Sequence, residues 1–285
     1  MIYFYNTFHI GDVHYSREFV KDMMVKLEDL DYCYLHNNNS LLLKDIDNLS
    51  HDNAFVTFNN WQLKTKYPFS YNGDVLNVNE DTYINTWIGQ GNMKYIKNKG
   101  CNLYTNYDMF GDIYNKLGIE YGDIEDYNPS INFSNLEISD IIKDDGKVKI
   151  LLCNNMPRTL SFNSIDLTDV AKKLSEEFSD VLFILSNDTD LNRDNVVHLS
   201  NLTNVNFDLN ELGKISTYCD IIVGKPSGPF CFTHIKDNLE DENKIFITCS
   251  EEYNNNLIWY KDSKSVEELL TNNDDIINYI KNKIK

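Results

Sequence analysis

The sequence lacks the features of several large protein classes. Its longest apolar runs, such as VLFIL at 181–185, are far too short to cross a bilayer. The N-terminus has neither a basic lead nor a long apolar core, so we expect no secretion signal. Basic residues are scarce: 26 Lys and Arg stand against 44 Asp and Glu, and the formal charge is −18. Binders of nucleic acid or of anionic membranes need a basic face, so we expect neither partner.

Cysteine pairs, metal-binding histidine groups and common nucleotide motifs are also missing. The six cysteines are scattered without a CxxC, which favours reduced thiols and a cytoplasmic location. The six histidines form no HxxxH and no His/Cys group. Asp-x-Asp recurs at 29–31, 45–47 and 188–190 of this Asp-rich chain, so the pattern is weak evidence for a metal, and we expect none. No GxSxG, Walker loop or GxGxxG is present.

Short apolar strands alternate with amphipathic helical patterns along the whole chain. This alternation predicts an α/β protein whose parallel sheets are covered on both faces. Asp166 and Asp208 stand where an N-cap would open a helix, and further helices are expected near 19–27, 92–98, 107–117 and 276–284. The predicted strands are 2–5, 31–35, 53–58, 82–88, 147–153, 181–186, 196–200, 219–224 and 244–249.

An acidic, weakly patterned stretch at 121–146 separates two rounds of this alternation. We therefore predict two Rossmann-like domains, at 1–140 and 147–285, that face each other across a cleft. Ligands of open parallel sheets lie beyond the carboxyl ends of the strands, so the strand-to-helix corners are the places to look for a site.

The strongest of these corners is CDIIVGKPSGPF at 219–230, where an apolar strand ends and a helix begins. The first N–H groups of a helix lack partners and lie at its positive end, so an anion is stabilised there. Gly228 would leave room for a close approach, Ser227 would add a hydroxyl and Lys225 a positive charge. The same residues also fit a plain helix start with Ser227 as its cap.

A second corner, IGDVHYS at 10–16, places Asp12 directly after Gly11 and before a helical pattern. A helix N-terminus would keep this carboxylate ionised, as a proton acceptor must be. The competing interpretation is that Asp12 is the N-cap of that helix.

These two corners resemble a known family. IGDVHYS is similar to the Gly-Asp corner that opens the ADP-heptose:lipopolysaccharide heptosyltransferases. The segment 198–235 is similar to the donor-site run of that family, in which a Leu-Gly turn, a helix and a strand precede a Ser-Gly-Pro helix start. The specific likeness covers about a quarter of the chain. It implies a GT-B fold, with an acceptor-binding N-terminal domain and a nucleotide-sugar-binding C-terminal domain, and the last helix of such folds can pack back on the first domain.

By this resemblance the chain is a glycosyltransferase that is inverting, uses no metal or other cofactor, and transfers a sugar from a nucleotide-diphosphate donor to a glycan or other hydroxyl acceptor. Asp12 would be the general base, and Lys225 and Arg158 would neutralise the departing diphosphate. The donor-binding residues would be Asn155, Arg158, Asn201, Lys225, Ser227 and Gly228. The acceptor contacts would be His9, His14, Asn60, Trp61, Trp87 and Gln90, although Trp87 also fits a buried core position.

The chain departs from the family at two positions of the donor corner. Pro226 stands where the family usually has aspartate, and Cys231 stands where it usually has histidine. Heptose and ADP are therefore not assumed, and a neutral acceptor fits the acidic first half better than a phosphorylated lipid core. The alternatives are a nucleotide-sugar epimerase, a pyruvyl transferase of similar fold, or a binding module without catalysis.

Overall fold

The computed structural model describes most of the 285 residues. The described ranges are 1–6, 10–36, 41–59, 62–69, 74–87, 103–122, 127–143, 146–155, 165–203, 208–250, 260 and 262–284. The helix predicted at 92–98 lies outside them. No helix among the described residues has the length and apolar character needed to span a bilayer.

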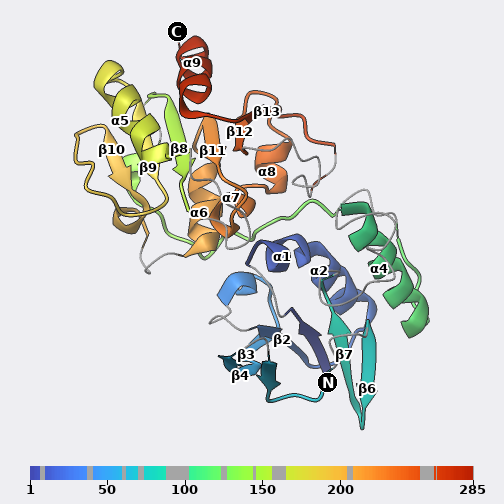
Figure 1. The fold of residues 1–285 in the computed structure, drawn as a ribbon. Helices are drawn as coiled ribbons and strands as arrows, with labels where there is room; N and C mark the ends of the chain where they lie inside the picture. The colour runs from blue at the N-terminus through green and yellow to red at the C-terminus, as the bar shows by residue number, and fades with distance from the viewer. Residues whose placement is uncertain are drawn as a thin grey trace. The chain divides into compact units, whose positions relative to one another are not determined.

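The chain divides into two compact units, and the first boundary between them falls after Ser130. This boundary lies inside the stretch that the sequence indicated as a connector. The division into functional domains at 1–140 and 147–285 stays a prediction. Both units are α/β structures, as the alternation predicts (Figure 1).

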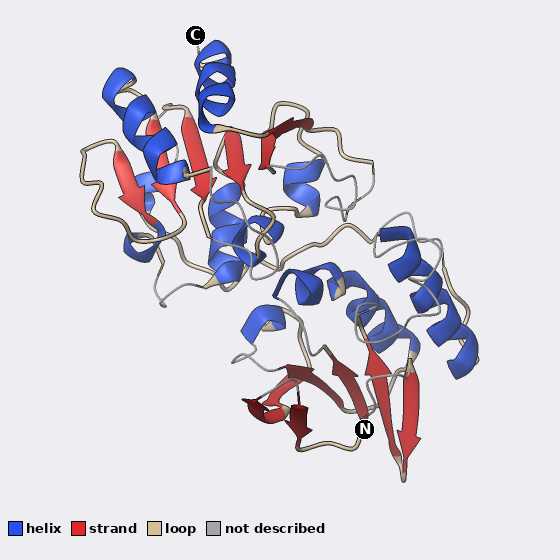
Figure 2. Ribbon diagram, in the orientation of Figure 1, coloured by secondary structure: helices blue, strands red, loops and turns tan. Residues whose placement is uncertain are grey.

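The first unit is built on a five-stranded sheet in the order β3-β2-β1-β7-β6. Its first four strands are parallel, and β6 is antiparallel at the edge (Figure 2). The bounds of these strands are β1 (Ile2–Tyr5), β2 (Tyr32–His36), β3 (Leu49–Asn53), β6 (Val75–Val78) and β7 (Asp81–Asn85). The helices are α1 (Ile10–Tyr15), α2 (Arg17–Lys26) and α4 (Leu103–Leu117).

Two details of the first unit differ from the sequence predictions. The strand predicted at 53–58 is β4 (Phe55–Asn59), and it pairs antiparallel with β5 (Gln62–Thr65) outside the main sheet. The edge of the main sheet beside β2 is formed by β3, whose sequence LSHDN is mostly polar and partly exposed. A polar edge strand carries no apolar run, so hydrophobicity alone did not reveal it.

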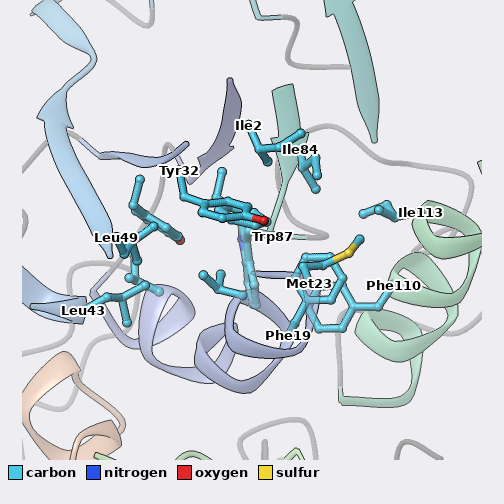
Figure 3. Close-up of a cluster of buried hydrophobic side chains, with 14 of the residues drawn as sticks. Ile2, Phe19, Met23, Tyr32, Leu43, Leu49, Ile84, Trp87, Phe110 and Ile113 are labelled. Carbon is cyan, nitrogen blue, oxygen red and sulfur yellow. The ribbon is translucent and has the colours of Figure 1, made fainter. Parts of the chain in front are cut away.

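The described helices of the first unit cover one face of its sheet. Phe19 and Met23 of α2 pack with Phe110 and Ile113 of α4 over this face, and the rings of Phe19 and Phe110 stack at 4.0 Å (Figure 3). The opposite face packs against Ala54, Phe69 and other side chains of the 54–69 region, with no described helix over it. The prediction that both faces are covered is therefore correct, but one cover is not helical.

The second unit contains a six-stranded sheet in the order β10-β9-β8-β11-β12-β13, and every neighbouring pair is parallel. Numbered along the chain, this is the Rossmann order 3-2-1-4-5-6. The strands are β8 (Lys149–Cys153), β9 (Leu182–Leu185), β10 (Val196–His198), β11 (Ile221–Gly224), β12 (Ile245–Cys249) and β13 (Val266–Leu270). The sequence missed β13, because the exposed edge sequence VEELL has the composition of a helix.

The second sheet is covered by helices on both faces (Figure 1). Helices α5 and α9 share one core cluster with alternate residues of the strands. Phe246 points to the opposite face and packs against Phe230 of α7. Asp166 and Asp208 accept hydrogen bonds from backbone N–H groups and cap α5 and α6, as predicted. The helices are α5 (Leu167–Glu177), α6 (Leu209–Ser216), α7 (Gly228–Cys231), α8 (Lys236–Leu239) and α9 (Asn273–Lys283).

The last helix places its apolar face in this second unit. Ile276, Ile277 and Ile280 are buried in the core shared with α5, and Lys173 of α5 forms an ion pair with Asp274 of α9 at 3.5 Å. Packing of this helix on the first domain, which the resemblance allowed, stays a prediction.

We predict that the first unit depends on one buried ion pair. Arg17 and Asp45 are paired at 0% and 2% side-chain exposure, and Arg17 also donates to the Leu42 carbonyl at 2.8 Å. Asp45→Asn leaves a buried guanidinium without its counter-charge, so we expect the free energy of unfolding to fall by about 3–5 kcal/mol. Urea denaturation measures the change.

The matched control is Asp140→Asn, which removes the exposed partner of Lys143. Exposed pairs contribute little, so this change should stay within about 0.5 kcal/mol of the unmodified chain. Equal effects of the two substitutions would contradict the role given to the buried pair.

Candidate functional site

Strand order identifies one switch point in each unit. In the second unit the order reverses between β8 and β11, and in the first between β1 and β7. The crevice beyond the carboxyl ends of such neighbouring strands is where open α/β sheets bind ligands. The corner with Lys225 and Ser227 follows β11, and α1 with Asp12 follows β1. Both predicted corners thus lie at switch points.

The corner after β11 is tied directly to the end of β8. Gly224 is in register with Cys153, and the Lys225 backbone N–H donates to the Cys153 carbonyl at 3.2 Å. The two chains therefore leave the sheet side by side. This contact places Asn154 and Asn155 next to the Lys225–Gly228 turn.

Gly224 is required by the way this corner folds. A Cβ at this position would lie 2.1 Å from Cδ2 of Phe230, far closer than carbon atoms approach. Phe230 turns back over the strand end and packs edge-on against His234 and Phe246. The aromatic ring thereby anchors the first turn of α7 on the sheet.

Ser227 occupies the N-cap position of α7, but its hydroxyl does not cap the helix. The side-chain oxygen is buried and makes no hydrogen bond to any residue in the described ranges. Pro229 follows in the first turn, as the sequence predicts. The capping interpretation explains why a serine stands at the start of α7. It does not explain why the hydroxyl is buried without a hydrogen bond, which is energetically costly.

Lys225 is buried beside this hydroxyl, with only 3% of its surface exposed. Its charge acts on Cys249 at the end of β12. Burial raises the pKa of that thiol to about 12, and the lysine charge opposes the rise. A buried lysine and a buried hydroxyl thus lie two residues apart in one turn.

Two neighbouring loops add polar groups at this edge. The Ser186 hydroxyl, just after β9, donates to Oδ1 of Asn155 at 2.6 Å and so orients the Asn155 amide. Asn154 instead bonds the start of α5 through Asp166 and the Leu167 N–H. Ser186 escaped the sequence analysis, although its place directly after a buried strand is a usable signal. Asn201 ends the short 3₁₀ helix η4 (Leu199–Asn201) and is exposed.

Asp12 lies inside the first turn of α1, not ahead of the helix as predicted. It is neither an N-cap nor the last residue of a loop. Its side chain is half-buried. Tyr34 of β2 has a pKa raised to about 12, mainly by burial. The negative charge of Asp12 raises this pKa further, whereas the hydrogen bonds to Ser16 and Thr86 lower it.

Two of the predicted acceptor contacts, Trp87 and His14, are buried in the first unit. Trp87 lies in the hydrophobic core of the first unit, with 6% exposure, and its backbone N–H donates to Oδ1 of Asn85 (Figure 3). His14 is fully buried and packs edge-on against Tyr15. Burial favours a structural role for both, because the large Trp87 ring fills the space between sheet and helices. The predicted site residues His9, Asn60, Trp61, Gln90 and Arg158 lie outside the described residues.

Within the described part of the chain, no group of three His, Cys, Asp or Glu side chains is placed to hold a metal ion. The prediction of a metal-free reaction is not tested by this finding and stays a prediction.

No family model matches the sequence, and no curated protein matches it significantly. Solved structures do match. The fold is similar to that of E. coli heptosyltransferase WaaC with ADP, at a TM-score of 0.57 and 10% identity over 99% of both chains. The same protein with ADP-2-deoxy-2-fluoro heptose matches at a TM-score of 0.54, 10% identity and the same coverage. A family 9 glycosyl transferase from Veillonella parvula DSM 2008 matches at a TM-score of 0.50 and 13% identity, over 100% of this chain and 90% of that one.

The chain has the heptosyltransferase fold. The resemblance inferred from two short sequence segments is thereby confirmed for the architecture over nearly the whole chain. At 10–13% identity the likeness extends to fold alone, so substrates and residue roles rest on the site itself.

We predict that Gly224→Ala displaces Phe230 and distorts the corner. Overpacking of this kind costs about 1–3 kcal/mol, so the melting temperature should fall. The control is Gly122→Ala, where the nearest atom to a new Cβ is the flexible Lys26 Nζ at 3.5 Å. Thermal denaturation should separate the two. A Gly224→Ala chain as stable as the unmodified protein would show that Phe230 does not hold the turn.

His234 should make the second unit sensitive to acid. Burial lowers its pKa to about 3, far below the usual 6.5. Between these two pH values His234 is protonated in the unfolded chain but neutral in the folded chain. The free energy of unfolding therefore falls as the pH drops below about 6.5, by roughly 1 kcal/mol per pH unit. His234→Phe should flatten this dependence. An unchanged slope of melting temperature against pH between 6.5 and 4 would assign the effect to other groups.

Proposed function

We propose that the protein is a glycosyltransferase that takes a sugar from a nucleoside-diphosphate donor. The observation that carries the proposal is the buried Ser227 hydroxyl, which has no partner among the described residues and lies next to buried Lys225 at the β8/β11 switch point. Hydroxyl and ammonium donors side by side suit the oxygens of a diphosphate. The N–H groups of Gly228 and Phe230 in the first turn add donors of the same kind.

In this proposal the second unit binds the donor. The diphosphate contacts Ser227, Gly228 and Lys225, and the Asn155 amide, oriented by Ser186, contacts the nucleotide beside them. Asn201 and Arg158 keep their predicted donor contacts. As the bond to the anomeric carbon breaks, negative charge grows on the departing diphosphate, and fixed positive charge there lowers the barrier.

The first unit supplies the base. Asp12 takes the proton of the acceptor hydroxyl while that oxygen attacks the anomeric carbon from the face opposite the leaving group, which inverts the configuration. The charge of the leaving group is met by protein groups, so the proposal needs no metal. It also requires that the two units face each other across a cleft, with Asp12 and Ser227 on its two walls.

The donor is proposed by chemistry, not by name. The similar solved structures are described with ADP and with an ADP-linked fluoro heptose, which supports a nucleoside-diphosphate sugar here. Pro226 and Cys231 alter the corner itself, so neither heptose as the sugar nor adenine as the nucleobase of the donor is assumed. A neutral glycan or other hydroxyl compound is the proposed acceptor.

A thermal-shift series with UDP-, GDP-, ADP- and dTDP-sugars tests donor binding. A bound donor stabilises the fold by about 3 kcal/mol at a hundred times its Kd, so the correct one should raise the melting temperature by several degrees. Ser227→Ala should weaken its affinity by roughly fivefold to tenfold. The exposed-loop control Ser134→Ala should leave affinity unchanged. Stabilisation by none of the sugars would indicate another ligand or a module that has lost the activity.

Asp12→Asn tests the chemical step. The amide cannot accept the proton, so transfer should slow by about 10²–10⁴-fold while the donor still raises the melting temperature. Product formation measured by mass spectrometry with a panel of sugar acceptors gives the rate. Undiminished turnover in Asp12→Asn would remove the base from the mechanism without touching the donor site.

A further inference from the structure

A buried polar network lies at the carboxyl edge of the first sheet, behind the helix that carries Asp12. Its centre is the Tyr34 hydroxyl, which lies 2.8 Å from Oγ1 of Thr86 and 3.3 Å from Oγ of Ser16. All three side chains are buried. Tyr34 belongs to β2, Thr86 follows β7 and Ser16 lies between α1 and α2, so one hydroxyl connects three parts of the fold at the switch point.

The direction of these hydrogen bonds follows from their other partners. The Ser16 hydroxyl donates to the Val13 carbonyl at 2.8 Å, and the Thr86 hydroxyl donates to the Tyr5 carbonyl at 3.2 Å. Each of the two hydroxyls has a single proton, which is thereby used. The Tyr34 proton is then the one available for these contacts, and Tyr34 donates to the serine or the threonine oxygen.

Asp12 lies on α1, the helix that ends next to this network. Ser16 directly follows α1, and its backbone N–H donates to the Val13 carbonyl at 3.2 Å, so the residue is tied to the last turn of that helix. The charge of Asp12 also acts on the Tyr34 hydroxyl. The other charged groups nearby on the same stretch are His14, which is buried, and Arg17, which pairs with Asp45.

We propose that Tyr34 is a positioning residue for Asp12: its hydroxyl fixes the face of α1 that presents the carboxylate at the edge of the sheet. Tyr34 does not touch the substrate. It acts by joining the Ser16 and Thr86 hydroxyls at the end of the helix that carries Asp12. The inference rests on the proposed function, because it gives Asp12 the role of base.

Burial suits this task. A phenol whose pKa stands near 12 keeps its proton throughout any practical assay, so the donor cannot switch off. Ionisation of Tyr34 would also place two negative charges together in the core, which the desolvated site disfavours. The network therefore holds α1 in one arrangement over the whole working range of pH.

The test compares Tyr34→Phe with Tyr32→Phe, two residues along the same strand. The Tyr32 hydroxyl donates to backbone carbonyls at the end of α2 and has no part in the network. In Tyr34→Phe we expect kcat of sugar transfer to fall between about tenfold and a hundredfold, through loss of alignment, with the donor KM unchanged. Tyr32→Phe should keep the original kcat.

A double substitution separates positioning from a general loss of structure. If Tyr34 acts through Asp12, then Tyr34→Phe adds no further loss to Asp12→Asn. Independent losses that multiply in the double variant would overturn the inference. Should Tyr34→Phe fold poorly, Thr86→Val removes one acceptor of the network and is expected to lower kcat in the same way.

One measurement needs no substrate. The Asp12 carboxyl carbon, identified by its absence from Asp12→Asn, can be titrated by NMR in each variant. The titration of Asp12 should shift in Tyr34→Phe, because its helix is no longer held in one arrangement, and should stay unchanged in Tyr32→Phe. An unmoved Asp12 titration would overturn the inference whatever the transfer assays show. Full transfer by Asp12→Asn would overturn the proposed base instead, so the two failures are distinguishable.

Discussion

The packing of Phe230 on Gly224 is the contact on which the candidate donor corner depends. The ring occupies the space where any side chain on Gly224 would lie, and it also packs against His234 and Phe246. It thereby holds a helix of only four residues against the end of β11. A helix this short has little intrinsic stability, so its first turn stays in place through tertiary packing. The buried positions of Ser227 and Lys225 follow from this arrangement.

Burial has opposite consequences at the two corners. In the second unit it surrounds the Ser227 hydroxyl, which has no partner among the described residues, and the Lys225 side chain. In the first unit it surrounds a network in which the Tyr34 hydroxyl bonds Ser16 and Thr86, and these two bond neighbouring carbonyls. In the function proposed above, the corner of the second unit binds the donor and the network of the first unit holds a helix in place, and binding and alignment contribute separately to rate.

The resemblance of two sequence segments to heptosyltransferases covered a small part of the chain, yet the fold agrees over nearly all of it. The strands β8, β9, β11 and β12 were recognisable in the sequence as apolar runs, because central parallel strands are buried on both faces. The edge strands β3 and β13 were not, although the edge strand β10 was predicted at 196–200. β3 and β13 contain polar and charged residues, since one side of each faces solvent, and their pairing depends on a neighbour far away in the sequence.

The sequence by itself determined the class of fold, the caps of α5 and α6, and the two corners where polar residues follow buried strands. These are local properties, decided by periodicity and by side chains next to the backbone that they bond. Only the tertiary structure decided that Trp87 and His14 are buried, that the Ser227 hydroxyl has no described partner, and that the Tyr34 hydroxyl lies within hydrogen-bond distance of Ser16. Such facts depend on which strands become neighbours, and strand order is a long-range property that no short stretch of sequence contains.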